Sequence, residues 1–419
     1  MPQHDPSHTG NPSSAPIPAA EPLLFAGLKV IDCASYIAGP AAATILADFG
    51  ADVIKIEPPE GDAYRNLWRA TGAPAADHNY PWEFDNRNKR GLALDLKHAD
   101  AIAVLHRLVA QCDVFVTNLP LPVRSRLQIG HDSLLALNPR LIYASMTAYG
   151  EVGPEAEKSG FDATAYWARS GMQDMVKPDH SAPPARAVAG LGDHPTATSL
   201  YAAIVTALYR RERTGLGGHV STSLMGNGLW AHAVQVQAQL MGVKYPPRPP
   251  RSNAPNPFGN PYRCADGRWL NLVMLNEARQ LPPLLDALEA TPLLQDPRFA
   301  TQEARRANTT ALIALLDLAF AKQDLTEWRK RLDKAGITFG VVGTLADIDD
   351  DVQMHAAGDL VPFADGAGLT VSNPVHLAGN PHRAPTRAPG LGQHSTEILQ
   401  DAGFDEAEIQ KLRSSQVIR

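Results

Sequence analysis

Cysteine is scarce in this sequence. It contains three cysteines, Cys33, Cys112 and Cys264, which lie far apart along the chain. A sparse and odd set argues against a disulfide framework and favours a reducing, cytoplasmic location. No spacing of cysteine or histidine is typical of a zinc site, so we expect no bound metal.

Long apolar runs and an excess of positive charge are also absent. No apolar stretch reaches the roughly 18 residues that span a bilayer. Residues 1–21 read as a disordered polar tail, without the apolar centre of a signal peptide. The chain carries 38 Lys and Arg against 44 Asp and Glu, a net charge of −6. We therefore expect neither a membrane nor nucleic acid as a partner, whereas anionic small molecules can still bind at local basic sites.

The common nucleotide and hydrolase fingerprints are missing too. The turn after the first expected strand, residues 34–40, has one glycine and lacks the G-x-G-x-x-G pattern. Neither a P-loop nor a G-x-S-x-G elbow occurs. These absences argue against a dehydrogenase, a P-loop ATPase or a serine hydrolase.

The sequence does contain a regular alternation of expected strands and helices. Short apolar runs rich in β-branched residues alternate with helical segments, which predicts an α/β fold. We expect strands at 28–33, 52–57, 92–96, 113–117, 141–147 and 219–224, and helices at 40–49, 98–111, 132–137 and from Asp162 and Asp193. This order predicts a Rossmann-like open parallel sheet with helices on both faces, whose ligands lie beyond the carboxyl ends of the strands.

A change in composition separates the middle of the chain from the part before it. The length of 419 residues suits about two domains. Residues 22–230 form the first part of a large domain, and the linker at 231–255 contains the stiff run YPPRPPR. A hairpin pattern at 258–274 and the helical segments after it predict a smaller α+β domain over residues 256–340.

Two groups of basic residues are candidates for binding phosphate. The segment NRNKR, residues 86–90, places three cations just before an expected strand, and Arg124 and Arg126 follow another. Such clusters can clamp a phosphate, but a solvated loop is the commoner outcome. From the residues alone, the solvated loop is favoured.

Two aspartates stand at expected helix starts. Asp193 lies in the run GLGDHP, residues 190–195, and Asp162 follows Gly160 and Phe161. An aspartate in this place is most often an N-cap. Alternatively, the glycines let a ligand approach closely, and the helix dipole holds the carboxylate ionised as a nucleophile. Spacing alone favours the N-cap.

Seven segments together carry a family resemblance. They are residues 27–62, 86–97, 112–120, 138–154, 190–220, 261–267 and 387–399. With these segments in order, the chain resembles the class III CoA-transferases of the CaiB/BaiF type, a family that also contains the α-methylacyl-CoA racemases. The resemblance implies a large Rossmann-like domain completed by residues 341–419, a small middle domain, and a homodimer of interlocked rings.

The resemblance also implies a mechanism. In these transferases an aspartate after a glycine at a helix start attacks the acyl-CoA thioester, and Asp193 matches it. An aspartyl anhydride and then an aspartyl-CoA thioester form before a carboxylic acid accepts the CoA. Coenzyme A is thus a co-substrate, and no metal, flavin or nicotinamide cofactor is implied.

Binding residues carry over from the family by position. The expected CoA contacts are Tyr36, Ile37, Leu94, Lys97, Asn118, Leu119 and Arg126, to which the suitability of arginine for phosphate adds Arg90. The expected substrate pocket contains Phe161, Asp162, Gly259 and Asn260. This chain lacks the glycine-run loop that closes the site in some transferases, and residues 256–260, which include Gly259 and Asn260, are the nearest candidate for such a loop.

Two other functions remain as alternatives. Racemases of the family use the histidine of a Gly-His-Asp motif as a base. Here the motif is Gly160-Phe161-Asp162, and because phenylalanine cannot take up a proton, this difference favours the transferase. His194 is expected to be a surface residue that points elsewhere. The third alternative is a CoA-binding protein without turnover, which the presence of Asp193 disfavours.

Overall fold

A six-stranded parallel sheet forms the larger part of the molecule. The computed structural model describes residues 22–70 and 73–419, so the predicted tail at 1–21 lies outside the described residues. The strand order is β3-β2-β1-β4-β5-β6, with every neighbouring pair parallel. The strands are β1 (Lys29–Asp32), β2 (Asp52–Glu57), β3 (Arg90–Ala93), β4 (Val114–Thr117), β5 (Ile142–Thr147) and β6 (Gly218–Ser223). The predicted Rossmann-like open parallel sheet is confirmed.

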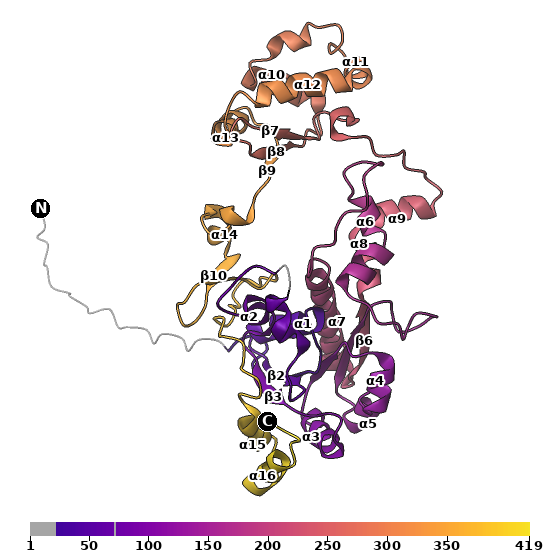
Figure 1. Ribbon diagram of the computed structural model, residues 1–419, viewed down its shortest axis with the longest axis vertical. Coiled ribbons are helices and arrows are strands. Elements are labelled where there is room, and N and C mark those ends of the chain that lie inside the picture. Colours follow the sequence, from indigo (N-terminus) through magenta and orange to yellow (C-terminus); the bar gives the residue numbers. More distant parts are fainter. Residues whose placement is uncertain (1–21, 71–72) are drawn as a thin grey trace, which may run out of the picture.

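Helices cover both faces of this sheet (Figure 1). One face packs against α1 (Ala38–Asp48) and α7 (Asp193–Thr214) in a single apolar cluster. The other face packs against α3 (Ala99–Val109), α5 (His131–Leu137), α15 (Ser395–Asp401) and α16 (Glu406–Ser414). The central strands are therefore buried on both sides, which explains their continuous apolar runs.

Helices α1 and α7 bring their amino ends to the same edge of the sheet. Helix α1 is rich in alanine and every one of its residues is buried, so it can pack closely against both the sheet and α7. It follows β1 and therefore starts at the carboxyl edge of the sheet. Helix α7 runs into β6 through a tight turn, so its first residue lies at that edge as well.

A second apolar core forms from the middle of the chain. Strands β7 (Pro261–Arg263), β8 (Trp269–Leu272) and β9 (Phe339–Val341) make an antiparallel sheet. It packs against α10 (Glu277–Ala287), α11 (Gln302–Ala307), α12 (Thr309–Phe320) and α13 (Leu325–Lys334). This unit occupies the upper part of Figure 1, away from the large sheet.

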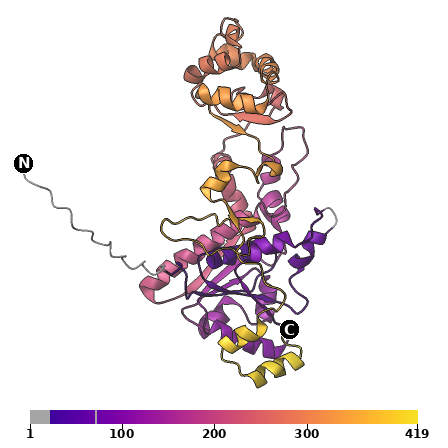
Figure 2. The same cartoon turned by 90° about the vertical axis from the view of Figure 1, so that its left-hand side faces the viewer.

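Two separate connections join the two cores (Figure 2). The outward one contains α8 (Leu224–Ala231) and α9 (Ala233–Leu240), and residues 245–250 of the proline-rich run after them form no helix or strand. The returning one contains α14 (Val352–Ala357), β10 (Leu360–Pro362) and β11 (Leu369–Val371). The chain then closes on the large sheet, where Ile418 pairs with Leu94 next to β3.

Short helices complete the structure. They are η1 (Ala63–Arg69), α2 (Tyr80–Asn86), α4 (Leu121–Arg126), the π-helix η2 (Asp162–Arg169), α6 (Met172–Met175), η3 (Arg251–Asn253), η4 (Thr291–Leu294) and η5 (Leu345–Asp347). Within residues 22–70 and 73–419, no helix combines the length and apolar character needed to cross a bilayer. The sequence did not predict α15, and β3 begins two residues earlier than expected because Arg90 already pairs with Ile54.

Candidate active site

The centre of the carboxyl edge lies between β1 and β4, where the strand order reverses. The loops after these two strands diverge there, which is where open α/β sheets bind ligands. Asn118, after β4, joins them: its side-chain oxygen accepts a hydrogen bond from the Ser35 N–H at 2.8 Å, and its amide donates to the Ser35 carbonyl at 2.7 Å. The predicted contacts Tyr36, Ile37, Asn118 and Leu119 are thus brought to one place.

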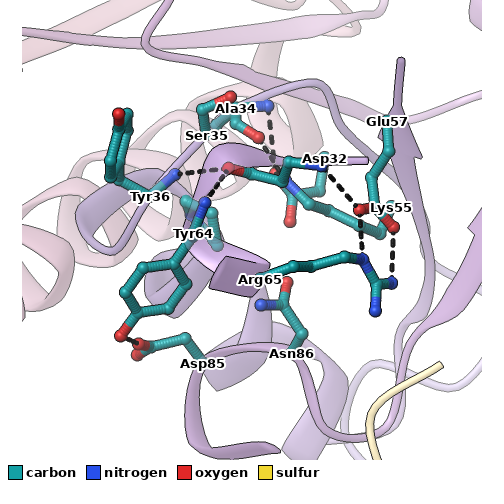
Figure 3. Close-up of polar contacts among 12 residues, drawn as sticks. Asp32, Ala34, Ser35, Tyr36, Lys55, Glu57, Tyr64, Arg65, Asp85 and Asn86 are labelled. Atoms are coloured by element: carbon teal, nitrogen blue, oxygen red, sulfur yellow. Dashed lines mark hydrogen bonds and ion pairs between the residues drawn. The ribbon is translucent and has the colours of Figure 1, made fainter. Parts of the chain in front are cut away.

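The Tyr36 loop is held in an unusual conformation. Tyr36 has a φ of 63°, which a bulky residue adopts only where its surroundings impose it. Asp62 accepts hydrogen bonds from the Tyr36 N–H at 3.5 Å and the Tyr64 N–H at 3.0 Å. Lys55 binds the Ala34 carbonyl and lies 3.3 Å from Asp62 (Figure 3). Buried polar groups beneath the loop therefore fix its backbone.

The NRNKR segment belongs to this buried support, so both predictions for it were wrong. Asn86, Arg87, Asn88 and Lys89 are all buried, which excludes a solvated loop. Lys89 donates to Asp32 at 2.8 Å, and Arg87 pairs with Asp48 at 2.8 Å. The sequence could not reveal this, because the partner carboxylates lie 39 and 57 residues away.

The fifth residue of that segment, Arg90, lies at the opposite end of the sheet. It is the first residue of β3, and its guanidinium contacts Asp52, Glu397 and Asp401 at 2.6 to 2.9 Å. Because ligands of such sheets lie at the carboxyl edge, the predicted contact of Arg90 with CoA is corrected to a structural ion-pair cluster.

The other predicted basic residues have different surroundings. Arg124 is buried and pairs with Glu151 at 2.5 Å, so it is structural. Arg126, on the last turn of α4, and Lys97, after β3, are exposed. Leu94 is fully buried in the core, so its side chain has no surface to offer a ligand.

Aromatic rings line the space above the Tyr36 loop. Tyr36 meets Phe161 edge-on with ring centroids 5.5 Å apart, and the Tyr36 and Tyr64 ring centroids are 6.5 Å apart. Phe161 is 57% exposed although it is large and apolar. The structure thereby places Phe161 next to the predicted CoA loop.

Asp193 is the first residue of α7, and the prediction that it caps the helix was wrong. Gly192 occupies the N-cap position, and the helix has no side-chain cap. A Cβ on Gly192 would lie 2.3 Å from the Tyr166 ring and 2.4 Å from the Asp162 carboxylate, so only glycine fits. The half-buried Asp193 carboxylate is consequently free of a capping role.

The prediction that the helix dipole holds Asp193 ionised also needs correction. Burial, together with the nearby carboxylates of Asp162 and Asp85, raises the pKa of Asp193 from 3.8 to about 7, against the opposing effect of His194. Repulsion between carboxylates and loss of water thus outweigh the helix dipole. The group titrates near neutral pH, as reactive groups in active sites often do.

Asp162 is a neighbouring carboxylate that the sequence analysis also singled out. It opens η2, is 5% exposed, and accepts a hydrogen bond from the Gly192 N–H at 3.4 Å. Its second oxygen is buried without a partner among the described residues. Burial raises the pKa of Asp162 as well, so two carboxyl groups share this corner of the site.

His194 and Asp85 are functional candidates that sequence reasoning missed. His194 was expected to point away, but its Nε2 lies 3.0 Å from the buried Asp85 carboxylate. The other Asp85 oxygen accepts a hydrogen bond from the Tyr64 hydroxyl at 2.6 Å. The available signal was that a histidine followed Asp193 directly, but its partner lies 109 residues earlier.

A large apolar pocket adjoins His194. Its volume is about 720 Å³, and it lies between α1, α2 and α7 with Phe84, Asp85 and His194 among its lining residues. Asp193 itself does not line it. No group of three or more histidine, cysteine or acidic side chains suited to a metal occurs in the part of the chain that the structure describes.

The predicted pocket residues Gly259 and Asn260 are not brought to this site. They precede β7 in the upper unit of Figure 1, where the buried Asn260 side chain reaches the Arg251 carbonyl at 3.4 Å.

Comparison with known proteins places this chain in a family. A model of CoA-transferase family III matches residues 25–395. The (R)-2-hydroxy-4-methylpentanoate CoA-transferase of Clostridioides difficile is 32% identical over 401 residues, which cover 95% of this chain and 100% of the relative. The chain belongs to CoA-transferase family III.

Other proteins similar to this family III chain agree in fold and activity class. The cinnamoyl-CoA:phenyllactate CoA-transferase of Clostridium sporogenes is 30% identical over 405 residues, with 94% of this chain and 97% of the relative covered. The crystal structure of a CaiB/BaiF family protein from Brucella suis matches with a TM-score of 0.81 and 29% identity, covering 91% of this chain and all of that one. The protein is thus a transferase enzyme, for which CoA is a co-substrate.

Proposed function

We propose that this protein moves CoA from an acyl-CoA thioester to a free carboxylic acid through covalent intermediates on Asp193. The observation that carries the proposal is the half-buried Asp193 carboxylate at the carboxyl edge, with no capping role and with a pKa of about 7. Such a group is ionised in a large share of molecules at neutral pH and is poorly solvated, so it is a competent nucleophile.

Every step of this proposal exchanges one acyl bond for another. A carboxylate oxygen of Asp193 attacks the thioester carbonyl, the C–S bond breaks, and CoA leaves as a thiolate. The thiolate attacks the aspartyl carbonyl of the anhydride, which gives the aspartyl-CoA thioester and releases the donor acid. The acceptor carboxylate attacks that thioester, the C–S bond breaks, and a second mixed anhydride forms between Asp193 and the acceptor acid. The freed thiolate then attacks the acceptor's carbonyl, which gives the new acyl-CoA. No net proton is gained or lost, and Asp193 is regenerated.

The proposed position of CoA follows from the residues at the switch point. We place its pantetheine arm beside Tyr36, Ile37, Asn118 and Leu119, because the sheet reverses order there. Lys97 and Arg126 are exposed cations on the flanks of this edge, which suits the CoA phosphates. Phe161 then lies near the acyl group, beside Tyr36.

Phe161 also separates transfer from racemisation. Its ring has no atom that can take up the proton next to a thioester carbonyl, so the two-base chemistry of a racemase lacks one base at this position. We expect no exchange of the α-proton of an acyl-CoA in deuterated water when no acceptor acid is present. Rapid exchange under these conditions, followed by mass spectrometry, would contradict the transferase proposal.

Trapping with hydroxylamine tests the nucleophile directly. Incubation with acyl-CoA and hydroxylamine is expected to convert Asp193 into a hydroxamate, which peptide mass spectrometry locates. Asp193→Ala should lose transfer by at least about a thousandfold, since covalent catalysis is removed. Its affinity for CoA should stay within about threefold, because Asp193 contributes little to ground-state binding.

A matched control stands at another helix start. Asp132, in the first turn of α5, is almost fully exposed, and Asp132→Ala should transfer CoA at the wild-type rate. Full activity in Asp193→Ala, or an unmodified Asp193 in the wild-type protein under turnover, would overturn the assignment of the nucleophile.

We also propose that the protein works as a homodimer of interlocked chains. Two observations support a ring-like chain: separate connections join the two cores, and the carboxyl-terminal residues pair back onto β3. Large apolar side chains on the outward connection are exposed, with Trp230 at 81% and Val234 at 74%. Such a surface is typical of a protein interface.

A further inference from the structure

A chain of three polar side chains lies beside Asp193 and takes no part in the steps above. The Tyr64 hydroxyl donates to one Asp85 oxygen at 2.6 Å, and His194 Nε2 lies 3.0 Å from the other. Tyr64 and Asp85 are nearly fully buried, whereas the His194 side chain is 42% exposed. Figure 3 shows the Tyr64 side chain, which comes from η1, reaching toward Asp85. These two hydrogen-bonded contacts thus link the neighbourhood of the proposed CoA loop with the first turn of α7.

The orientation of the His194 ring is fixed from several sides. The Phe84 ring meets it edge-on with centroids 5.2 Å apart. Gly190 also lies close to the ring, since a Cβ on it would come within 3.4 Å of the imidazole. Asp85 is so buried that its carboxylate needs a charged or hydrogen-bonding partner, and it has His194 and Tyr64. Burial alone would lower the pKa of His194, but the hydrogen bond and charge of Asp85 raise it above its ordinary value.

The titratable groups around Asp193 act on its charge in different directions. Asp162 on η2 and Asp85 on α2 are acidic, and both disfavour the ionised form of Asp193. The Tyr64 hydroxyl on η1 is close enough to feel the Asp193 charge, but it is neutral. Among the described residues that influence Asp193, His194 is the one that favours its ionised form.

We propose that His194, oriented by Asp85 and Tyr64, is a positioning residue whose positive charge keeps the Asp193 carboxylate ionised for attack. This inference rests on the proposed function. His194 transfers no proton and forms no bond with the substrate; it offsets the repulsion from Asp162 and Asp85. The buried Asp85 carboxylate in turn favours the protonated form of the imidazole.

The test compares the rate of hydroxamate formation on Asp193 across pH 5.5 to 9.5 in variants. Rates are expressed relative to the wild-type protein at each pH, so that the titration of hydroxylamine itself cancels. His194→Gln removes the positive charge, so the pH at which Asp193 labelling falls off on the acid side (the acid limb of the pH–rate profile) should rise by about one unit. Labelling should then be about tenfold slower than wild type near pH 6 and close to the wild-type rate above pH 9. His194→Lys retains a cation and should stay within about twofold of wild type throughout.

A second histidine provides the control. His219 on β6 lies 3.2 Å from Glu151 and is not among the groups that influence Asp193. The rate of Asp193 labelling in His219→Gln, relative to the wild-type protein, should therefore be the same at every pH. Thermal unfolding at each pH identifies variants that are unfolded.

Each outcome decides the proposal. If the acid limb of His194→Gln stays where it is in the wild-type protein, the proposal is overturned. The proposal is also overturned if the acid limb of His194→Lys shifts as far as that of His194→Gln. Equal loss of labelling at all pH values means a structural role and also overturns it. In those cases the wild-type label still supports the proposed function, whereas a wild-type protein without any label contradicts both.

Discussion

The charge on Asp193 has a consequence for stability as well as for reaction. Burial and neighbouring carboxylates raise its pKa in the folded protein to about 7, whereas in the unfolded chain it is near the ordinary 3.8. Between these values the folded state binds more protons, so stability falls as pH rises from about 4 to 7. Below about pH 4 both states are protonated and the penalty vanishes.

Asp193→Asn should therefore stabilise the protein at alkaline pH. Because the group is partly solvated, we discount the full linkage and expect about 1 to 2 kcal/mol at pH 8, with little difference near pH 4. Urea unfolding at the two pH values measures this, and the exposed Asp132→Asn should show no such pH dependence. A variant that is less stable than wild type at pH 8 would contradict the raised pKa.

At the residue scale, the sequence located the proposed nucleophile but not its surroundings. The GLGD motif pointed to Asp193, because glycines before a carboxylate at a helix start form a short local pattern. Asp85 and Tyr64 come from two other elements, and their contacts with His194 and with each other join residues far apart in sequence. The direction of the pKa shift was mispredicted for the same reason: local sequence shows the dipole, while burial and Asp162 depend on the fold.

At the element scale, the ends of the strands decide what a cation can do. The sequence analysis predicted CoA contacts for both arginines, Arg126 because it matches a phosphate-binding position of the family and Arg90 because arginine suits the CoA phosphates. The sheet places Arg90 at the amino end of β3, and Arg126 follows the carboxyl end of β4. An ion-pair cluster with two carboxylates of α15 occupies the first guanidinium, whereas the second is exposed.

Replacing each arginine with alanine should affect a different property of the protein. Arg90→Ala is expected to lose about 1 kcal/mol of unfolding free energy, because a partly buried cluster is broken, with KM for acyl-CoA unchanged. Arg126→Ala should raise that KM about fivefold to tenfold through a lost phosphate contact, with stability within about 0.5 kcal/mol of wild type. Steady-state kinetics and urea unfolding of the pair measure both effects. A selective rise in KM for Arg90→Ala would restore the original prediction.

At the scale of the whole molecule, alternating patterns predicted the parallel sheet and the hairpin of the middle unit. Both follow from local hydrophobic periodicity, which short segments display on their own. The closure of the chain does not, because Ile418 meets Leu94 across more than 300 residues. Helix α15 was missed for a related reason: its first turn follows a glycine-rich run, and its burial depends on the far side of the sheet.

Chain closure makes interlocking testable in solution. Two rings that pass through each other cannot separate unless one chain unfolds in part, and unfolding of a stable protein is slow. Tagged and untagged wild-type proteins, purified separately and then mixed, should form no mixed dimers over about a day at 25 °C. Co-expression of the two forms should give mixed dimers, which native mass spectrometry resolves. A monomer in sedimentation experiments would contradict the homodimer, whereas mixed dimers within minutes would leave a dimer of ordinary, separable subunits, in which the exposed apolar surface around Trp230 is simply covered by the partner.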